Sequence, residues 1–109
     1  MKQLSIYDKE YPDFRSLDRE EVLKIVSEET GLIFEYNEQF DEYRCKKALA
    51  RFGGVGTLTF NIGTYKRGEK QGQKCISVGF FCPLNARGFP VESIGEAIEF
   101  YIQTIGGVL

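Results

Sequence analysis

Residues 55–83 read VGTLTFNIGTYKRGEKQGQKCISVGFFCP, and this stretch decides the fold. In both halves of the stretch, apolar and polar side chains alternate. The apolar set is Leu58, Phe60, Ile62, Ile76, Val78, Phe80 and Cys82. Such alternation is the pattern of a strand with one buried face. Between the halves, residues 66–73 (KRGEKQGQ) are polar and include two glycines, as in a loop. We therefore predict an antiparallel β-hairpin.

Two amphipathic helices are predicted on either side of this hairpin. The first covers Leu17–Thr30: Asp18-x-x-Glu21 has capping-box spacing, and Gly31 provides a stop. The second begins at Ser93-x-x-Glu96, another capping-box pattern, and is expected to stop at residues 106–107, a Gly-Gly pair. Its apolar residues follow helical spacing and are Ile94, Ala97, Ile98, Tyr101, Ile102 and Ile105.

The remaining segments are less regular. Leu32–Tyr36 is short and rich in apolar and aromatic residues, which favours a strand. Tyr43–Phe52 fits either a helix or a strand, and we expect a strand because the six residues before it make a normal hairpin loop. Pro83–Pro90 is expected to be an irregular linker, since it has a proline at each end. Residues 1–15 are expected to form a loosely packed arm.

These elements predict an α+β fold in one domain, residues 1–109. We expect a two-layer sandwich in which an antiparallel sheet of three to four strands carries both helices on one face. The order of helix, sheet and helix resembles, in topology, the double-stranded-RNA-binding domain. Such domains carry lysines at the start of their last helix, where this chain has Glu92, Ser93 and Glu96.

Composition excludes several chemistries. The 109 residues include no histidine, which removes the Ser-His and Cys-His dyads and the commonest metal ligand. The three cysteines, Cys45, Cys75 and Cys82, have no C-x-x-C spacing, so neither a zinc ribbon nor a disulfide framework is expected. No motif places a catalytic pair. We therefore expect no enzymatic activity, no metal and no cofactor.

Apolar runs are short throughout the chain. Residues 1–10 contain no signal-peptide core, and no stretch approaches the roughly 20 apolar residues of a membrane span. A cytoplasmic location without membrane association is expected.

Charge is distributed in blocks, although the formal net charge is only −2. Residues 1–43 carry a net charge of −7, residues 44–91 carry +8, and three glutamates near the end carry −3. Folding can interleave these blocks or leave opposed acidic and basic surfaces.

The first functional hypothesis is a small non-catalytic protein that binds a larger protein. Its expected anchors are the aromatic residues Tyr7, Tyr11, Phe14 and Phe81, because interfaces favour aromatic side chains. The hairpin face that carries Phe81 is otherwise built from Thr, Ser, Asn, Cys and Gly residues and could receive a partner. Small single-domain proteins of this kind are common among phage and mobile-element accessory factors, including inhibitors, and a homodimer is also compatible with the sequence.

The alternative hypothesis is binding of nucleic acid or a nucleotide by the basic hairpin. Lys66, Arg67, Lys70 and Lys74 would contact phosphates, and Tyr65 would stack on a base. The sequence pI of about 5.2 is low for a nucleic-acid-binding domain, which makes this the second choice.

Overall fold

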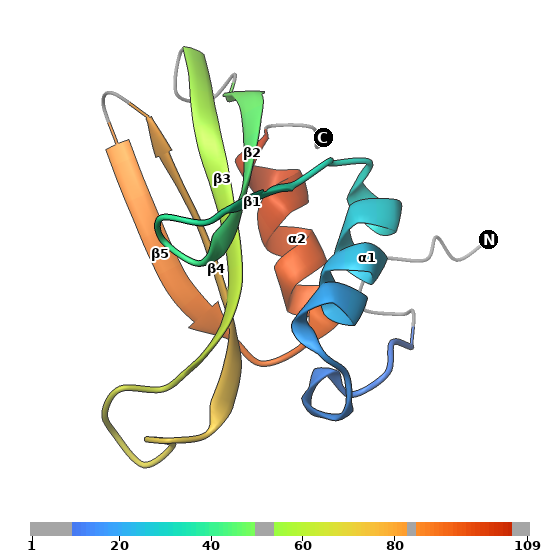
Figure 1. The fold of residues 1–109 in the computed structure, drawn as a ribbon, viewed down its shortest axis with the longest axis vertical. Coiled ribbons are helices and arrows are strands. Elements are labelled where there is room, and N and C mark those ends of the chain that lie inside the picture. The colour runs from blue at the N-terminus through green and yellow to red at the C-terminus, as the bar shows by residue number, and fades with distance from the viewer. Residues whose placement is uncertain (1–9, 50–53, 83–84, 106–109) are drawn as a thin grey trace, which may run out of the picture.

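The computed structural model describes residues 10–49, 54–82 and 85–105, and the side chains of 47–49, 54, 55, 82 and 85 fall outside that description (Figure 1). The elements follow the order of a short 3-10 helix, an α-helix, five strands and an α-helix. They are η2 (Phe14–Ser16), α1 (Arg19–Thr30), β1 (Glu35–Asn37), β2 (Glu42–Leu49), β3 (Gly54–Thr64), β4 (Lys74–Cys82), β5 (Asn85–Val91) and α2 (Ile94–Thr104).

The strands form one antiparallel sheet in the order β1-β2-β3-β4-β5, so every strand pairs with its neighbours in sequence. The α+β class and the antiparallel sheet are confirmed. The predicted hairpin is β3 and β4, with Leu58 opposite Phe80 and Ile62 opposite Ile76. The sheet has five strands among the described residues, whereas the sequence predicted three to four.

The additional strand is β5, in the segment expected to be an irregular linker. It pairs with β4 from Asn85 to Val91, and Pro90 lies opposite Ser77. Proline cannot donate a backbone hydrogen bond, but an edge strand has one side that needs no partner within the sheet. The expectation of a linker was therefore wrong because β5 is the last strand of the sheet.

The two strands predicted before β3 are both present, with different bounds. Residues 42–49 form β2, with Cys45 opposite Leu58, which confirms the choice of strand over helix for that part of the prediction; residues 50–52 lie outside the described residues. The strand predicted over Leu32–Tyr36 begins later, at Glu35, and includes Asn37. Leu32 is buried although it lies outside the strand.

Local capping explains the helix boundaries. In α1 the Asp18 carboxylate accepts from the backbone N–H of Glu21, and the Glu21 side chain accepts from the backbone N–H of Asp18. Gly31 ends the helix with φ of 75°, a left-handed conformation that glycine adopts without strain. In α2 the Ser93 hydroxyl accepts from the backbone N–H of Glu96. The stop expected at residues 106–107 lies outside the described residues.

One core joins the helices and the sheet. Figure 1 shows α1 and α2 on the same side of the sheet, and residues of both helices belong to a single buried cluster. Tyr101 of α2 is a fully buried member of this cluster. Its ring meets that of Phe34 edge-on at 5.4 Å, and its hydroxyl donates to the backbone carbonyl of Thr59. Neither α1 nor α2 has the length and apolar composition that crossing a membrane requires.

Candidate functional site

The sheet has a second face, which α1 and α2 do not cover in Figure 1. Strand pairing assigns its residues, because directly opposed residues share a face. We call this surface the outer face, and it consists of Glu35, Asn37, Glu42, Arg44, Lys46, Thr57, Thr59, Asn61, Gly63, Cys75, Ser77, Gly79, Phe81, Ala86, Gly88 and Pro90. Most of these side chains are small or polar, so the few large ones define its chemistry.

Arg44 is flanked by two exposed aromatic rings, Phe81 on the outer face and Phe40 in the turn between β1 and β2. Its guanidinium carbon lies 4.7 Å from the ring centroid of Phe40 and 5.3 Å from that of Phe81. Phe40 is 56% exposed and Phe81 is 40% exposed. Arg44 Nε also donates to Glu42 Oε2 at 2.6 Å, which fixes the direction of the guanidinium. The arrangement presents two rings and one cation to solvent at a single place.

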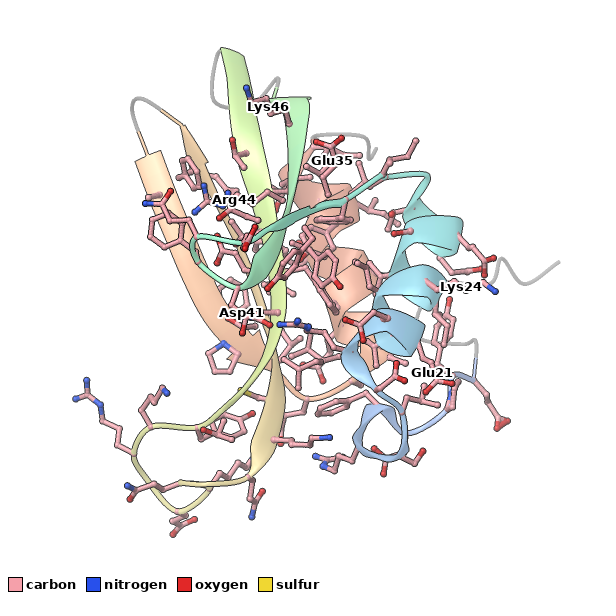
Figure 2. The ribbon with its side chains drawn as sticks, viewed as in Figure 1. Glu21, Lys24, Glu35, Asp41, Arg44 and Lys46 are labelled. Atoms are coloured by element: carbon pink, nitrogen blue, oxygen red, sulfur yellow. The ribbon has the colours of Figure 1, made fainter. Side chains whose placement is uncertain are left out.

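A cavity of about 350 Å³ lies next to this group, at the β1 side of the outer face. Its lining residues are Glu35, Tyr36, Asn37, Arg44, Lys46 and Thr57. Figure 2 shows Arg44 and Lys46 on β2 and Glu35 on β1. Lys46 is exposed and pairs with none of the described carboxylates. The cavity thus adds an available cation beside the aromatic pair.

The four aromatic residues predicted as anchors have different locations. Phe81 is exposed on the outer face, as a partner anchor would need to be. Tyr11 is partly buried against the core, and its hydroxyl donates to Glu29 Oε1 at 2.8 Å. Burial, together with this bond, raises the pKa of Tyr11 to about 12. Tyr7 lies outside the described residues.

Phe14 does not reach the surface. Its side chain is 2% exposed and belongs to the core, so the expectation of an exposed anchor in a loose arm was wrong for this residue. The physical reason is the 3-10 turn of η2, which Asp13 caps by accepting from the backbone N–H of Arg15. The turn directs the ring into the core.

The basic residues of the hairpin do not form one continuous surface. Lys70 Nζ donates to both carboxylate oxygens of Glu92, and this bond raises the pKa of Lys70. Lys66 and Arg67 line a cavity of about 450 Å³ together with Tyr65, and Lys74 is not part of that lining. Lys70 Nζ lies 5.7 Å from the centroid of the Tyr65 ring, so three of the four predicted cations are close to the predicted tyrosine, and two of them line the cavity with it.

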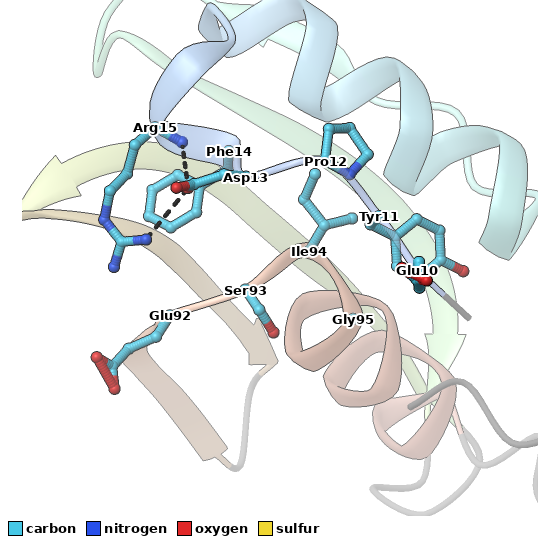
Figure 3. Close-up of a pocket in the computed structure, with 10 residues that line it drawn as sticks. All are labelled: Glu10, Tyr11, Pro12, Asp13, Phe14, Arg15, Glu92, Ser93, Ile94 and Gly95. Atoms are coloured by element: carbon cyan, nitrogen blue, oxygen red, sulfur yellow. Dashed lines mark hydrogen bonds and ion pairs between the residues drawn. The ribbon is translucent and has the colours of Figure 1, made fainter. Parts of the chain in front are cut away.

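A third cavity, of about 400 Å³, separates the N-terminal segment from the start of α2 (Figure 3). Its polar groups are largely engaged within the protein. Asp13 Oδ1 lies 3.1 Å from Arg15 Nη1, and Ser93 caps α2. The cavity contains Glu10, Asp13 and Glu92 beside one arginine, Arg15, which gives it no excess of positive charge.

The described side chains offer little reactive chemistry. No group of three or more His, Cys, Asp or Glu side chains in this part of the chain is placed to hold a metal ion. Cys45 and Cys75 are buried free thiols. Burial raises the pKa of Cys75, and the charge of Lys66 partly opposes that effect, so the thiolate form is disfavoured.

Sequence reasoning identified Phe81 but missed Phe40. Phe40 lies in the turn between β1 and β2, where its backbone N–H donates to the Asn37 side chain at 3.0 Å. The sequence feature that could have identified Phe40 is an aromatic residue within an otherwise polar predicted turn. Comparison of the chain with protein-family models, with curated proteins and with solved structures found no match.

Proposed function

We propose that this chain is a small, non-catalytic cytosolic protein that binds a larger protein through its outer face. The observation that carries the proposal is the exposed group of Phe40, Arg44 and Phe81. Phenylalanine and arginine are enriched in protein interfaces, and energetically dominant contacts cluster at such central aromatic groups. In the simplest case, the protein acts by covering a surface of its partner with this face. Such an action is consistent with an accessory or inhibitory role.

The charges around the aromatic pair indicate what the partner should present. Glu42 partly balances the charge of Arg44, whereas Lys46 has no carboxylate partner among the described residues. A carboxylate of the partner opposite Lys46 would therefore be favourable, and apolar surface opposite Phe40 and Phe81 would remove both rings from water. The proposed partner surface is apolar with an acidic margin.

The same geometry favours a protein over a nucleic-acid strand at this place. The Arg44 guanidinium lies near both rings and occupies part of the ring surface on which a base would stack. This part of the outer face also carries two carboxylates, Glu35 and Glu42, and two cations, Arg44 and Lys46. It therefore has no net positive charge to attract a phosphate backbone, although Lys46 forms no ion pair with a described carboxylate. Nucleic-acid or nucleotide binding remains the second candidate at the hairpin end, where Lys66, Arg67 and Tyr65 share a cavity.

The proposal can be tested with a photo-crosslinking amino acid at position 81. The substituted chain is expressed in its native host, irradiated, and its covalent adducts are identified by mass spectrometry. We expect one dominant protein adduct from position 81 and no such adduct from position 33, because Ile33 is 81% exposed but precedes β1 outside the outer face. The partner found in this way is then produced for direct binding measurements.

Binding measurements with that partner decide the role of the aromatic group. Phe81→Ala and Phe40→Ala should each weaken binding about tenfold or more, as expected for hot-spot residues, while Ile33→Ala should leave it unchanged. Equal affinities for all three variants, or adducts that are the same from positions 81 and 33, would contradict the proposed interface.

A further inference from the structure

The cavity of about 450 Å³ at the hairpin end is open to the outer face. Its floor comes from three adjacent strands, with Gly63 of β3, Cys75 and Ser77 of β4, and Gly88 of β5. The segment that follows β3 supplies Tyr65, Lys66 and Arg67 to the lining. The volume and the mixture of apolar walls with a few polar groups are those of sites for small molecules.

The cavity carries a local excess of positive charge. Neither Lys66 nor Arg67 pairs with a carboxylate in the described parts of the chain. Glu92 acts on Tyr65 electrostatically, but Lys70 pairs with Glu92 and compensates its charge. An anionic group entering the cavity would therefore meet two available cations.

The floor leaves room for the flat body of a ligand. A Cβ atom added at Gly63 would have nothing within 4 Å, and one added at Gly88 would meet only a backbone oxygen at 3.7 Å. Gly79, on the same face, differs: an added Cβ would lie 2.6 Å from the Arg87 carbonyl oxygen. Gly63 and Gly88 thus border open space, and the Ser77 hydroxyl lies between them as a hydrogen-bonding group.

We propose that this cavity binds a nucleoside monophosphate group, an inference that rests on the second candidate function above and narrows it to one ligand class. Lys66 and Arg67 would contact the phosphate, and the planar base would lie over the glycine floor beside Tyr65 and Pro90. A phosphate ion alone would leave most of the cavity empty, whereas a nucleoside adds the flat apolar body that the walls accommodate. The group belongs either to a free nucleotide or to the phosphorylated 5′ end of a nucleic-acid strand.

This site is separate from the protein-binding group, because Phe40, Arg44 and Phe81 do not line the cavity. The two proposals can therefore fail independently. Phe81→Ala should leave nucleotide binding unchanged, and removal of the two cavity cations should leave the crosslink from position 81 unchanged.

The test is a titration of the ¹⁵N-labelled full chain, followed through the backbone amide signals of Gly63 and Gly88. The probes are adenosine 5′-monophosphate, adenosine, inorganic phosphate, and a short oligonucleotide with and without a 5′-phosphate. We expect saturable shifts with adenosine 5′-monophosphate and affinities at least about tenfold lower for adenosine and for phosphate. Tighter binding of the 5′-phosphorylated oligonucleotide than of the mononucleotide would support the proposal and assign the source to a strand end.

Three variants complete the test. The double change Lys66→Ala with Arg67→Ala should weaken nucleotide binding about tenfold or more, and Lys74→Ala, an exposed lysine outside the cavity lining, should not. Gly63→Val should fill the cavity and abolish binding in a folded chain. The proposal would be overturned if the nucleotide caused no shifts, or if the shifts persisted in both the Lys66→Ala/Arg67→Ala variant and the Gly63→Val variant. It would also be overturned if Lys74→Ala weakened binding equally, or if phosphate bound as tightly as the nucleotide.

Discussion

Arg19 Nη1, in the first turn of α1, donates a hydrogen bond of 3.1 Å to Asp41 Oδ1, in the turn between β1 and β2. Asp41 also accepts from the Tyr36 hydroxyl at 2.8 Å, and its backbone carbonyl accepts from the Asn61 side chain at 2.9 Å. Its φ of 51° is left-handed, which is uncommon for a residue other than glycine. The Asp41 carboxylate thus connects the turn to α1 through Arg19, and the Asp41 backbone carbonyl connects the same turn to β3 through Asn61.

Replacing Arg19 should destabilise the contact between α1 and the turn that joins β1 and β2. The guanidinium lies 5.2 Å from the ring centroid of Tyr43 and 3.0 Å from Asn61 Oδ1 in addition to its bond with Asp41. We expect Arg19→Ala to lower the free energy of unfolding by about 1–2 kcal/mol, measured by urea denaturation. Lys24→Ala, an exposed change on the same helix, should stay within about 0.5 kcal/mol. Equal effects of the two changes would show that the network contributes nothing.

Protonation of Asp41 at low pH should weaken the same contact between the turn and α1. Hydrogen bonds from Tyr36 and then Arg19 lower the pKa of Asp41 below its usual value of 3.8. A carboxyl group with a lowered pKa in the folded state contributes stability above its unfolded pKa and loses it as the pH falls through the folded value. The melting temperature should therefore fall below about pH 4, and part of that fall should disappear in Asp41→Asn.

The sequence predicted the elements that local patterns determine. Alternation in β3 and β4 is visible in the chain, and so are the caps at Asp18 and Ser93, because each involves residues close in sequence. By contrast, β5 depends on its position beside β4. Gly88 and Pro90 hide its alternation, and only the pairing across the sheet makes it a strand.

The candidate sites depend on contacts between distant segments, which a sequence pattern does not encode. Phe14 and Phe81 look equivalent in the chain, yet one belongs to the core and the other lies on the outer face. The position of Arg44 between Phe40 and Phe81 requires the register of β2, β3 and β4. The pairing of Lys70 with Glu92 likewise spans 22 residues.

The contrast between Phe14 and Phe81 yields a direct stability test. Phe14→Ala should cost about 3–5 kcal/mol of unfolding free energy, because it removes a buried ring and leaves a cavity. Phe81→Ala should cost less than about 1 kcal/mol, since the ring is already 40% exposed. Chemical denaturation of both variants checks the difference. A small loss for Phe14→Ala would mean that η2 is not part of the core.

A variant of Tyr101 tests how much its hydrogen bond contributes to the packing of α2 on the sheet. It is 0% exposed, and its hydroxyl donates to the Thr59 backbone carbonyl. Tyr101→Phe keeps the ring and removes only that bond, so we expect a loss of about 1–2 kcal/mol in unfolding free energy. Gln103→Ala, on the exposed side of α2, is the control and should be close to neutral. A neutral Tyr101→Phe would show that ring packing alone holds the helix.

Gly79 and Gly63 are both on the outer face but should respond oppositely to alanine. At Gly79 the new Cβ would meet the Arg87 carbonyl oxygen at 2.6 Å and Thr59 Oγ1 at 2.8 Å, so β4 and β5 would have to shift. We expect Gly79→Ala to lower the free energy of unfolding by about 1–3 kcal/mol. Gly63→Ala has open space and no left-handed φ, and the reduced entropy of the unfolded chain should raise stability by about 0.4–1 kcal/mol. Thermal and urea unfolding of the pair give the comparison. A stabilising Gly79→Ala would mean that β5 does not approach β4 as closely as the structure places it.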